Sequence, residues 1–208
     1  MNSKLQLSVA PHKRNASRTR EGLLDAAFVE IYRSGFQGSD LNSIITRAGV
    51  TKGALYHHFG SKEGLALAMI DAVVAPRIAA AWTAPLGETE DPVAALIAIV
   101  KALPLDDASI RGGCPLNNLA LEMSPLDDTF RVRLARIFNA WIAGIAGALR
   151  RGKAAGKVRG DVNVFEFATH LVASYEGFVS LAKAAQDPAL LTVGIASMTR
   201  MLEDLRPA

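Results

Sequence analysis

The sequence contains a single cysteine, Cys114, among its 208 residues. One thiol excludes an internal disulfide framework and is typical of a protein of the reducing cytoplasm. Long hydrophobic runs are also lacking, because stretches such as Val93–Val100 are far shorter than the roughly 18–20 residues that cross a bilayer. The N-terminal residues show neither the apolar region nor the cleavage site of a signal peptide. We therefore expect a cytoplasmic protein without a membrane partner.

The motifs of common enzyme classes are lacking too. The sequence has no Gly-rich phosphate-binding loop, no nucleophile elbow and no HExxH pair. We therefore expect no enzymatic activity, no catalytic residue and no cofactor. His57 and His58 are adjacent, but neighbouring residues of a helix project about 100° apart and cannot easily ligate one ion. No metal site is predicted.

Acidic residues are scarce in the first third of the chain. Residues 1–70 carry nine Lys and Arg against five Asp and Glu, whereas the remaining 138 residues carry 14 and 15. A basic excess confined to one segment indicates an anionic partner for that segment. The alternative is a basic tail without a binding role.

Apolar residues at helical spacing are abundant. Half of the chain is apolar, and no alternating strand pattern persists, so we predict an all-α protein. In the first part, helices are expected over 17–34, 41–48, 52–59 and 62–75, the last ending before Pro76. Ser39 or Asp40, Thr51 and Ser61 are the expected N-caps of the last three. In the second part, helices are expected over 92–103, 115–124, 128–153, 162–186 and 188–205, with Asp161 capping the fourth.

The segment Gly49–Leu65, GVTKGALYHHFGSKEGL, joins short amphipathic helices. Gly49 lies where a tight turn between two helices needs a positive φ. Apolar residues on both sides of the turn supply the contacts between the helices, namely Ile44, Ala48, Val50, Leu55 and Phe59. This is the helix-turn-helix layout, in which the second helix keeps its outer face free for DNA.

The outer face of the helix over 52–59 carries groups that suit DNA. Lys52 can reach a phosphate or a guanine, and Thr51 and Tyr56 can hydrogen-bond phosphate oxygens. Gly53 lets the helix approach the groove closely. Lys62, in the first turn of the next helix, adds a positive charge where free backbone N–H groups already favour a phosphate.

These residues carry a family resemblance. The stretch from Gly35 to Leu65, GFQGSDLNSIITRAGVTKGALYHHFGSKEGL, closely resembles the DNA-binding domain of the TetR/AcrR family of bacterial transcriptional repressors. The match includes the Gly-Val turn, the KGALYHHF recognition helix and the SKEGL start of the following helix, and it covers residues 18–70. The segment GCPLNNLALEMS also looks like one that recurs in a branch of this family.

The resemblance implies a three-helix DNA-binding domain followed by a larger helical domain that binds an effector and dimerises, with about nine or ten helices in all. We divide the chain into a flexible basic tail at 1–16, a helix-turn-helix domain at 17–60 and an effector-binding and dimerisation domain at 61–208. The implied partners are a double-stranded DNA operator, a small-molecule effector and a second copy of the chain, and the apolar composition favours an apolar or aromatic effector. The implied function is a repressor that the effector releases from a palindromic operator.

The resemblance and the residue types together select candidate site residues. Those expected to contact DNA lie in and around the helix-turn-helix at 40–59: Arg18, Arg20, Ser39, Thr51, Lys52, Gly53, Tyr56, His57 and Lys62. Those expected to line the effector pocket are Trp82, Cys114, Asn117, Asn118, Met123, Phe138, Trp141 and His170. Small residues over 140–152 and 168–185 suit a four-helix interface between two subunits, and packing within one subunit is the alternative.

Two residues leave alternatives open. Cys114 is either a small buried apolar residue or a thiol whose thiolate is stabilised at a helix N-terminus and senses electrophiles or oxidants. Ile45 stands where the family usually has a small residue, so it must repack the contact between the helices or rotate outward. If Ile45 abolishes DNA binding, the protein is a small-molecule carrier. A DNA-associating protein without sequence preference is the other alternative.

Overall fold

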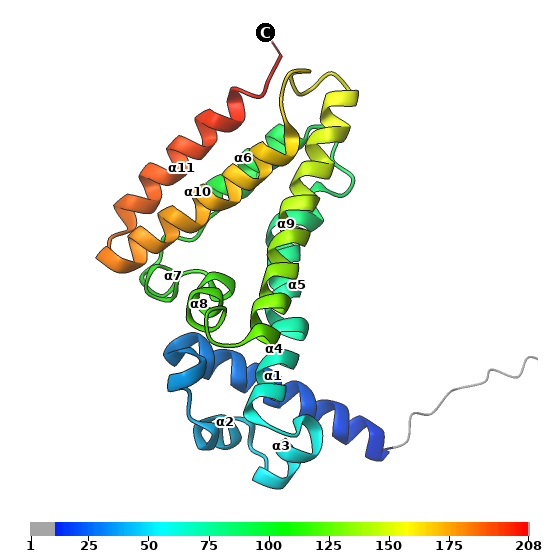
Figure 1. The fold of residues 1–208 in the computed structure, drawn as a ribbon, viewed down its shortest axis with the longest axis vertical. Helices are drawn as coiled ribbons and strands as arrows, with labels where there is room; N and C mark the ends of the chain where they lie inside the picture. Colours follow the sequence, from blue (N-terminus) through cyan, green and yellow to red (C-terminus); the bar gives the residue numbers. More distant parts are fainter. Residues whose placement is uncertain (1–10, 208) are drawn as a thin grey trace, which may run out of the picture. The chain divides into compact units, whose positions relative to one another are not determined.

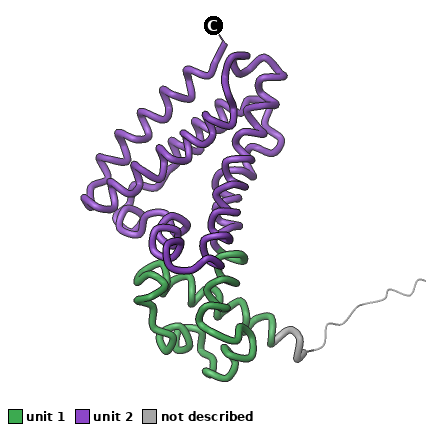
Figure 2. The backbone as a smooth tube through the Cα atoms, in the orientation of Figure 1, with its two compact units in different colours: residues 1–73 green, residues 74–208 purple. Residues whose placement is uncertain are grey.

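The computed structural model describes residues 11–207. These residues form helices and no strand, as the sequence predicts (Figure 1). The chain divides into two compact units, residues 1–73 and 74–208 (Figure 2). Residues 1–10, which belong to the expected flexible tail, lie outside the described residues.

The described part of the first unit is helical: α1 (Pro11–Gly38), α2 (Leu41–Ala48), α3 (Lys52–Phe59) and α4 (Lys62–Met69). Helix α1 packs against the other three. Its apolar stripe of Leu23, Ala27 and Ile31 is buried, together with Ile44 of α2 and Leu55 of α3. Removing this apolar area from water stabilises the unit by about 25 cal/mol per Å². The ranges predicted for α2 and α3 are confirmed.

Helix α1 differs from the expected range 17–34 at both ends. It begins at Pro11, so residues 11–16, which were expected to belong to the tail, are helical. Gly35 interrupts it with φ 76° and ψ 170°, a conformation that glycine adopts without strain. The predicted break at Gly35 is confirmed, and a short helical stretch follows it to Gly38.

The N-caps of the short helices agree with the prediction. Backbone N–H groups in the first turns of α2, α3 and α4 donate hydrogen bonds to the side chains of Asp40, Thr51 and Ser61. Gly49 follows α2 with φ 64°, in the left-handed conformation that the turn before α3 needs. Local side chains therefore set where each of these helices begins and ends.

Helix α4 belongs to the first unit, whereas the domain boundary was predicted before it. It packs against α1 and α3, and Leu65, Ala66 and Met69 are buried. The chain then stays helical through π-helical η1 (Ile70–Val74), α5 (Ala75–Ile78), π-helical η2 (Ala79–Thr83) and the 3-10 helix η3 (Ala84–Leu86). The predicted stop at Pro76 is wrong, because the helical run continues from η1 into α5, which contains Pro76 in its first turn.

The rest of the second unit consists of α6 (Pro92–Lys101), α7 (Asp107–Gly112), α8 (Pro115–Met123), α9 (Asp128–Ala154), α10 (Val164–Ala185) and α11 (Pro188–Glu203). Helix α9 packs against η2, α8 and α10, while α10 also packs against α7 and α11. Helices α10 and α11 run side by side (Figure 1). Helices α9 and α10 thus carry Phe138, Trp141 and His170, and α9 packs against η2 and α8, which carry most of the other candidate effector residues.

Two details of this unit were not predicted. The short helix α7 forms because Asp106 accepts a hydrogen bond from the backbone N–H of Ser109 (3.0 Å), which caps it. Helix α10 begins after Asn163 and not after Asp161, since the Asn163 side chain accepts hydrogen bonds from two N–H groups of the first turn. Both asparagine and aspartate serve as N-caps, so the pattern alone did not separate the two positions.

Two helical stretches, Lys62–Leu86 and Asp128–Ala154, are long and apolar enough to cross a membrane by length and composition. None was expected from the sequence. The core helices of soluble proteins pass the same test. Trp82 in the first stretch, and Phe130 and Trp141 in the second, are almost fully buried inside the protein. We therefore interpret both stretches as core helices.

Candidate DNA interface and effector site

Helix α3 presents the predicted DNA-binding residues on its outer face. Leu55 is fully buried, whereas Lys52, Gly53, Tyr56 and His57 are exposed. Tyr56 is 44% exposed, and the Lys52 ammonium lies 6.0 Å from the centroid of its ring. An exposed cation beside an exposed phenol supplies donors for phosphate oxygens and base edges.

The start of α3 exposes backbone as well as side chains. Thr51 Oγ1 accepts a hydrogen bond from the Ala54 N–H (3.2 Å), which leaves the hydroxyl proton free to be donated to a phosphate. A Cβ placed at Gly53 would meet only Thr51 Oγ1, at 3.8 Å, which is an ordinary contact. The described residues of the unit therefore do not require glycine at position 53.

Two arginines of α1 lie on the exposed surface, as predicted. Arg18 and Arg20 are both exposed. The Arg20 guanidinium lies 5.6 Å from the centroid of the Phe59 ring at the end of α3, in a cation–π contact. A positive charge of α1 is thereby held beside the recognition helix.

Ser39 and Lys62, predicted to contact DNA, both have hydrogen-bond partners inside the unit. Ser39 is 6% exposed, and its hydroxyl donates to the carbonyl of Phe36 (2.7 Å). Lys62 Nζ donates to the backbone carbonyls of Ser39 (2.7 Å) and Gln37 (3.4 Å). The Lys62 charge thus ties the start of α4 to the segment between α1 and α2. We leave both side chains out of the DNA contacts.

A polar surface beside α2 was not predicted from the sequence. It is a depression lined by Glu30, Arg33, Asp40, Asn42, Ser43, Thr46 and Arg47. Glu30 is 4% exposed and forms an ion pair with Arg33 (2.8 Å). Burial alone would raise the pKa of Glu30, but hydrogen bonds from Arg33, the Asp40 N–H and Ser34 hold it below its usual value. Arg47, exposed in the last turn of α2, adds a cation to this surface. In the sequence, the feature that could have pointed to Arg47 is its position two residues before the turn glycine, Gly49.

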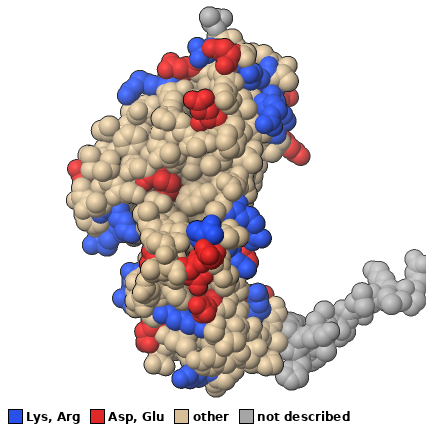
Figure 3. All heavy atoms as spheres, viewed as in Figure 1, with Lys and Arg blue, Asp and Glu red and all other residues tan. Residues whose placement is uncertain are grey.

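Charges on the visible face of the first unit form separate patches. Figure 3 shows Lys and Arg interspersed with Asp and Glu, without a single continuous basic field.

Ile45 does not disturb the turn between α2 and α3. Its side chain is half-buried. The Gly49 N–H donates to the carbonyl of Thr46 (3.1 Å), and the Val50 N–H donates to the carbonyl of Ile45 (3.3 Å). The turn therefore keeps its hydrogen bonds with isoleucine present, which removes the structural argument for a carrier that has lost DNA binding.

In the second unit, the two tryptophans of the chain meet Tyr175 of α10. The ring centroids of Trp82 and Trp141 are 5.0 Å apart, and Tyr175 lies 4.8 Å from Trp82 and 5.6 Å from Trp141. Phe138 stacks on Trp141 at 6.3 Å. The structure thus brings together the aromatic residues predicted for the effector pocket, and Tyr175, which was not selected, completes the cluster.

Polar side chains join the start of α8 to α10. Asn117 Nδ2 donates to Ser180 Oγ (3.2 Å), and Lys183 Nζ donates to Asn118 Oδ1 (2.8 Å). Met123, at the other end of α8, is buried. Both predicted asparagines are therefore held by side chains of α10.

Cys114 and Glu176 interact between α8 and α10. Cys114 is 2% exposed. Its burial, and next the nearby Glu176 carboxyl, raise the pKa of the thiol. A buried thiol with a raised pKa is a poor nucleophile. Burial therefore favours the small buried apolar residue over the stabilised thiolate for this cysteine.

Glu176 is the residue of this region that was not predicted. It is 8% exposed, and neither carboxyl oxygen has a hydrogen-bond partner among the described residues. Burial raises the pKa of Glu176 to about 7, and the Cys114 thiol, a weak donor, opposes that rise. Val172 and Val179, at helical spacing on either side, are buried. An acidic residue within a buried apolar stripe is the sequence feature that could have identified Glu176 as a candidate site residue.

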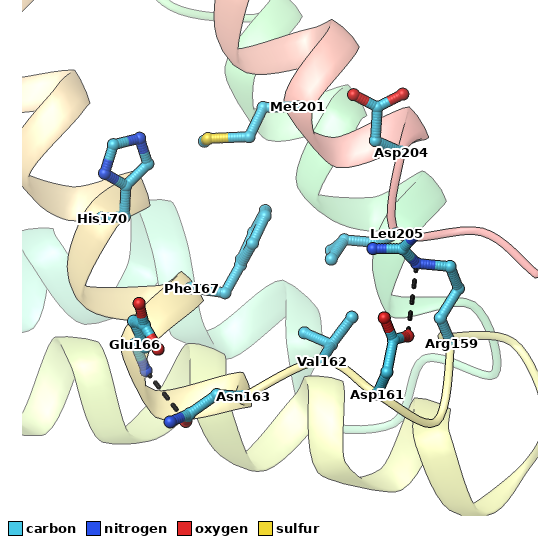
Figure 4. Close-up of a pocket in the computed structure, with 10 residues that line it drawn as sticks. All are labelled: Arg159, Asp161, Val162, Asn163, Glu166, Phe167, His170, Met201, Asp204 and Leu205. Carbon is cyan, nitrogen blue, oxygen red and sulfur yellow. Dashed lines mark hydrogen bonds and ion pairs between the residues drawn. The ribbon is translucent and has the colours of Figure 1, made fainter.

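His170 does not lie with these residues, which corrects its predicted place in the effector pocket. It is exposed and lines a separate cavity of about 470 Å³ at the start of α10 and the end of α11. Figure 4 shows Phe167 in the middle of the lining residues, with His170 on one side and the ion pair of Arg159 and Asp161 (3.5 Å) on the other. Five helical positions separate His170 from Tyr175, which turns the two side chains about 140° apart.

Both units match known domain families. Residues 23–69 match the bacterial regulatory proteins of the tetR family, and residues 92–198 match the tetracyclin repressor-like C-terminal domain. The chain belongs to the TetR family. The first match contains the helix-turn-helix, and the second contains the aromatic cluster residues Trp141 and Tyr175 as well as Glu176.

Relatives of this TetR-family chain are also regulators. An uncharacterized HTH-type transcriptional regulator in the lacX 3' region of Lactococcus lactis subsp. lactis is 34% identical over 60% of this chain and 65% of its own length. The HTH-type transcriptional repressor DhaR of Mycobacterium sp. (strain GP1) is 26% identical over 77% of this chain and 80% of its own length.

Solved structures share the fold of both units. A TetR transcriptional regulator from Chloroflexus aurantiacus J-10-FL has a TM-score of 0.82 at 27% identity, with 94% of this chain and 100% of that chain covered. The regulatory protein TetR from Rhodobacter sphaeroides has a TM-score of 0.77 at 25% identity, with 88% and 97% covered.

The protein is therefore a ligand-responsive, DNA-binding transcriptional repressor of the TetR family. Regulators of this family are soluble, bind DNA and small-molecule effectors, and act as dimers. The family is one of regulators and not of enzymes.

Proposed function

We propose that the exposed face of α3 binds the major groove of a palindromic operator. The observation that carries this proposal is Gly53, where the described residues leave space and do not require glycine. Lys52 and Gly53 lie nearest the bases, and the exposed Tyr56 and His57 bind the phosphate backbone with Thr51. Arg18 and Arg20 add phosphate contacts from α1, and their strength falls as salt rises.

The second copy of the chain docks on α10 and α11. Each helix exposes a stripe at helical spacing, made of Ala173, Gly177 and Leu181 on α10 and of Ala189, Val193 and Ala196 on α11. Leu181 and Val193 are 56% and 59% exposed. Over these helices the visible surface carries few charged side chains (Figure 3). A Cβ placed at Gly177 would meet nothing within 4 Å, which leaves room for a partner helix.

Helix α9, whose small residues were predicted to share the interface, is left out of it in this proposal. A Cβ at Gly144 would crowd Thr83, and one at Gly152 would crowd Pro92. These glycines therefore serve packing within the unit, and α11 takes the place of α9. In the resulting dimer, two recognition helices enter successive major grooves about 34–36 Å apart or at a related spacing.

The effector binds beside the cluster of Trp82, Trp141 and Tyr175. Trp82 lies in a helical run, Lys62–Leu86, that begins directly after the recognition helix. An effector that displaces Trp82 shifts this run and changes the separation of the two recognition helices in the dimer. The coupling requires only that the effector bind the DNA-incompetent state more tightly, typically by about 1–3 kcal/mol. This function operates in the cytoplasm and involves binding without catalysis.

Selection from a random DNA pool by the full-length protein tests the DNA-binding proposal. We expect enrichment of one palindromic motif with half-sites spaced for a dimer. Lys52→Ala and Tyr56→Ala alter exposed side chains, so both variants should keep the helical far-UV circular dichroism spectrum and lose the enrichment. The proposal is contradicted if the wild-type protein enriches no motif. It is also contradicted if both variants enrich the same motif as the wild type.

A further inference from the structure

Among the described residues, the second unit buries three side chains with polar atoms that lack a hydrogen-bond partner: Trp141, Glu176 and Thr199. Both carboxyl oxygens of Glu176 and the indole N–H of Trp141 lack a hydrogen-bond partner among the described residues. Glu176 is 8% exposed and Trp141 is 1% exposed. Leaving such groups unpaired opposes folding, because the desolvation of each is not compensated. A bound molecule with a positively charged donor would pair the Glu176 carboxyl, the one acidic group among them.

One of these groups belongs to the aromatic cluster, and another is next to a cluster residue in the sequence. Trp141 is one of its members, and Glu176 directly follows another, Tyr175, on α10. Aromatic rings attract cations through their quadrupoles, and a buried carboxylate attracts them through its charge. The combination of aromatic rings with one unpaired acid is the chemistry that binds an organic cation.

The protein itself does not neutralise Glu176. Lys183 lies two turns further along α10, where its ammonium donates to Asn118 Oδ1 (2.8 Å). The polar group that interacts with the carboxyl is the Cys114 thiol of α8, which is a weak donor and carries no positive charge. Within the described residues the negative charge of Glu176 is therefore available to a ligand.

We propose that Glu176 anchors an organic cation, whose ammonium group binds the carboxylate while its aromatic or alkyl body rests against Trp82, Trp141 and Tyr175. The proposal rests on the proposed effector function and names the chemical class of that effector. It replaces the wholly apolar effector expected from composition with an amphipathic one that has a single cationic group.

Binding of such a cation releases a proton. Burial raises the pKa of Glu176 to about 7, so the carboxyl is largely neutral below that pH. An ammonium group requires the ionised form, and its affinity therefore rises as pH rises through about 7. Cys114 is the titratable neighbour, and its raised pKa keeps the thiol neutral over this range. A neutral ligand has no reason to release a proton here.

Isothermal titration of the purified full-length protein, without DNA, tests the proposal. The probes are benzylamine and 4-phenylbutylamine, each compared with the alcohol that has a hydroxyl in place of the amine. Experiments just below pH 7 in buffers of different ionisation enthalpy count the protons released. Because the chain has two tryptophans and both lie in the cluster, tryptophan emission reports independently whether this site is occupied.

We expect saturable binding of the amines, at least about tenfold tighter than of the alcohols, with proton release. Glu176→Gln keeps the shape of the side chain and should remove both the preference and the proton release. Glu88→Gln changes an exposed acid of the same unit and should leave both unchanged. Absence of saturable amine binding, equal binding of amines and alcohols, or amine binding unchanged by Glu176→Gln would each overturn the proposal.

This outcome is separable from that of the proposed regulatory function. The wild-type comparison of amines with alcohols needs no variant, so it tests the cation site even if Glu176→Gln fails to fold. If amines bind through Glu176 and do not release operator DNA, the cation site stands and the proposed effector role is wrong. If neutral apolar compounds release DNA and amines do not bind, the regulatory function stands and the cation site is wrong.

Discussion

Lys62 donates a hydrogen bond from its ammonium to the backbone carbonyl of Ser39 (2.7 Å), so a charge at the start of α4 holds the segment that leads into α2. The sequence predicts that Lys62 contacts a DNA phosphate, because it lies in the first turn of a helix. Lys52 also lies in a first turn, but its ammonium is on an exposed face of α3. The two lysines therefore have different roles.

Replacing each lysine by methionine, which keeps an apolar stem, should separate these roles. Lys62→Met should destabilise the first unit by about 1–2 kcal/mol, because two backbone carbonyls lose a charged donor. Lys52→Met should leave stability unchanged and reduce the slope of log affinity against log salt by about 1. Thermal unfolding and DNA titrations at several salt concentrations measure both effects. A reduced slope for Lys62→Met would return that residue to the DNA contacts.

Two glycines, one in the first turn of α3 and one in the first turn of α4, should respond oppositely to alanine. Gly53→Ala should stabilise the protein by about 0.5–1 kcal/mol, because alanine favours a helix and its Cβ has space. Gly64→Ala should destabilise it, since a Cβ there would overlap the backbone carbonyl of Phe59. Urea unfolding of the two variants measures both effects. A destabilised Gly53→Ala would mean that the fold, and not DNA, requires glycine at position 53.

Glu176 should make stability depend on pH. Its pKa is about 7 in the folded protein, against an ordinary value of 4.5, so between these values the folded state binds more protons than the unfolded state. The contribution is therefore fully present below about 4.5 and is lost as pH rises to about 7. Urea unfolding of the wild type and Glu176→Gln across this range isolates it. A difference in unfolding free energy that stays constant with pH would show that Glu176 titrates normally.

Cys114 should react slowly with a maleimide while the protein is folded. Burial raises the pKa of its thiol and also blocks access of the reagent. Labelling should therefore require local unfolding around Cys114. In denaturant the rate should rise to that of a free thiol. Cys114→Ser should keep DNA binding. Rapid labelling of the folded protein, followed by loss of DNA binding, would restore the sensing thiol as an explanation.

Leu181→Glu should convert the dimer into monomers, because it places a charge in an apolar interface on α10. Leu121→Glu, on α8, is the matched control, since Leu121 is 72% exposed and lies outside the stripe on α10 and α11. Light scattering after size-exclusion chromatography measures the mass of each. Dimers of Leu181→Glu as stable as those of the control would place the interface elsewhere.

Local patterns determine the elements that the sequence predicted well. The ranges of α2 and α3 follow from Asp40, Gly49 and Thr51, whose side chains or φ preferences act on neighbouring residues. The same holds for the outward groups of α3, because helical spacing alone separates them from Leu55. Family resemblance then supplied the function that these groups serve.

Tertiary neighbours determine what the sequence could not give. Lys62 meets backbone carbonyls that lie beyond two other helices in the chain, and His170 differs from Tyr175 by its direction around α10. The buried carboxyl of Glu176 meets Cys114, far from it in the chain. The helical run through Pro76 includes π-helical turns, and the conformational preferences of single residues do not predict such turns.

The most direct test of DNA reading by α3 is the affinity of wild-type protein and Gly53→Ala for the selected palindromic motif and for an unrelated duplex of equal length. Fluorescence anisotropy at one fixed salt concentration is sufficient. We predict that the wild type prefers the motif by about a thousandfold or more, and that Gly53→Ala folds, dimerises and loses this preference. Equal affinity of the wild type for both duplexes, or a preference unchanged in Gly53→Ala, would contradict the role assigned to α3.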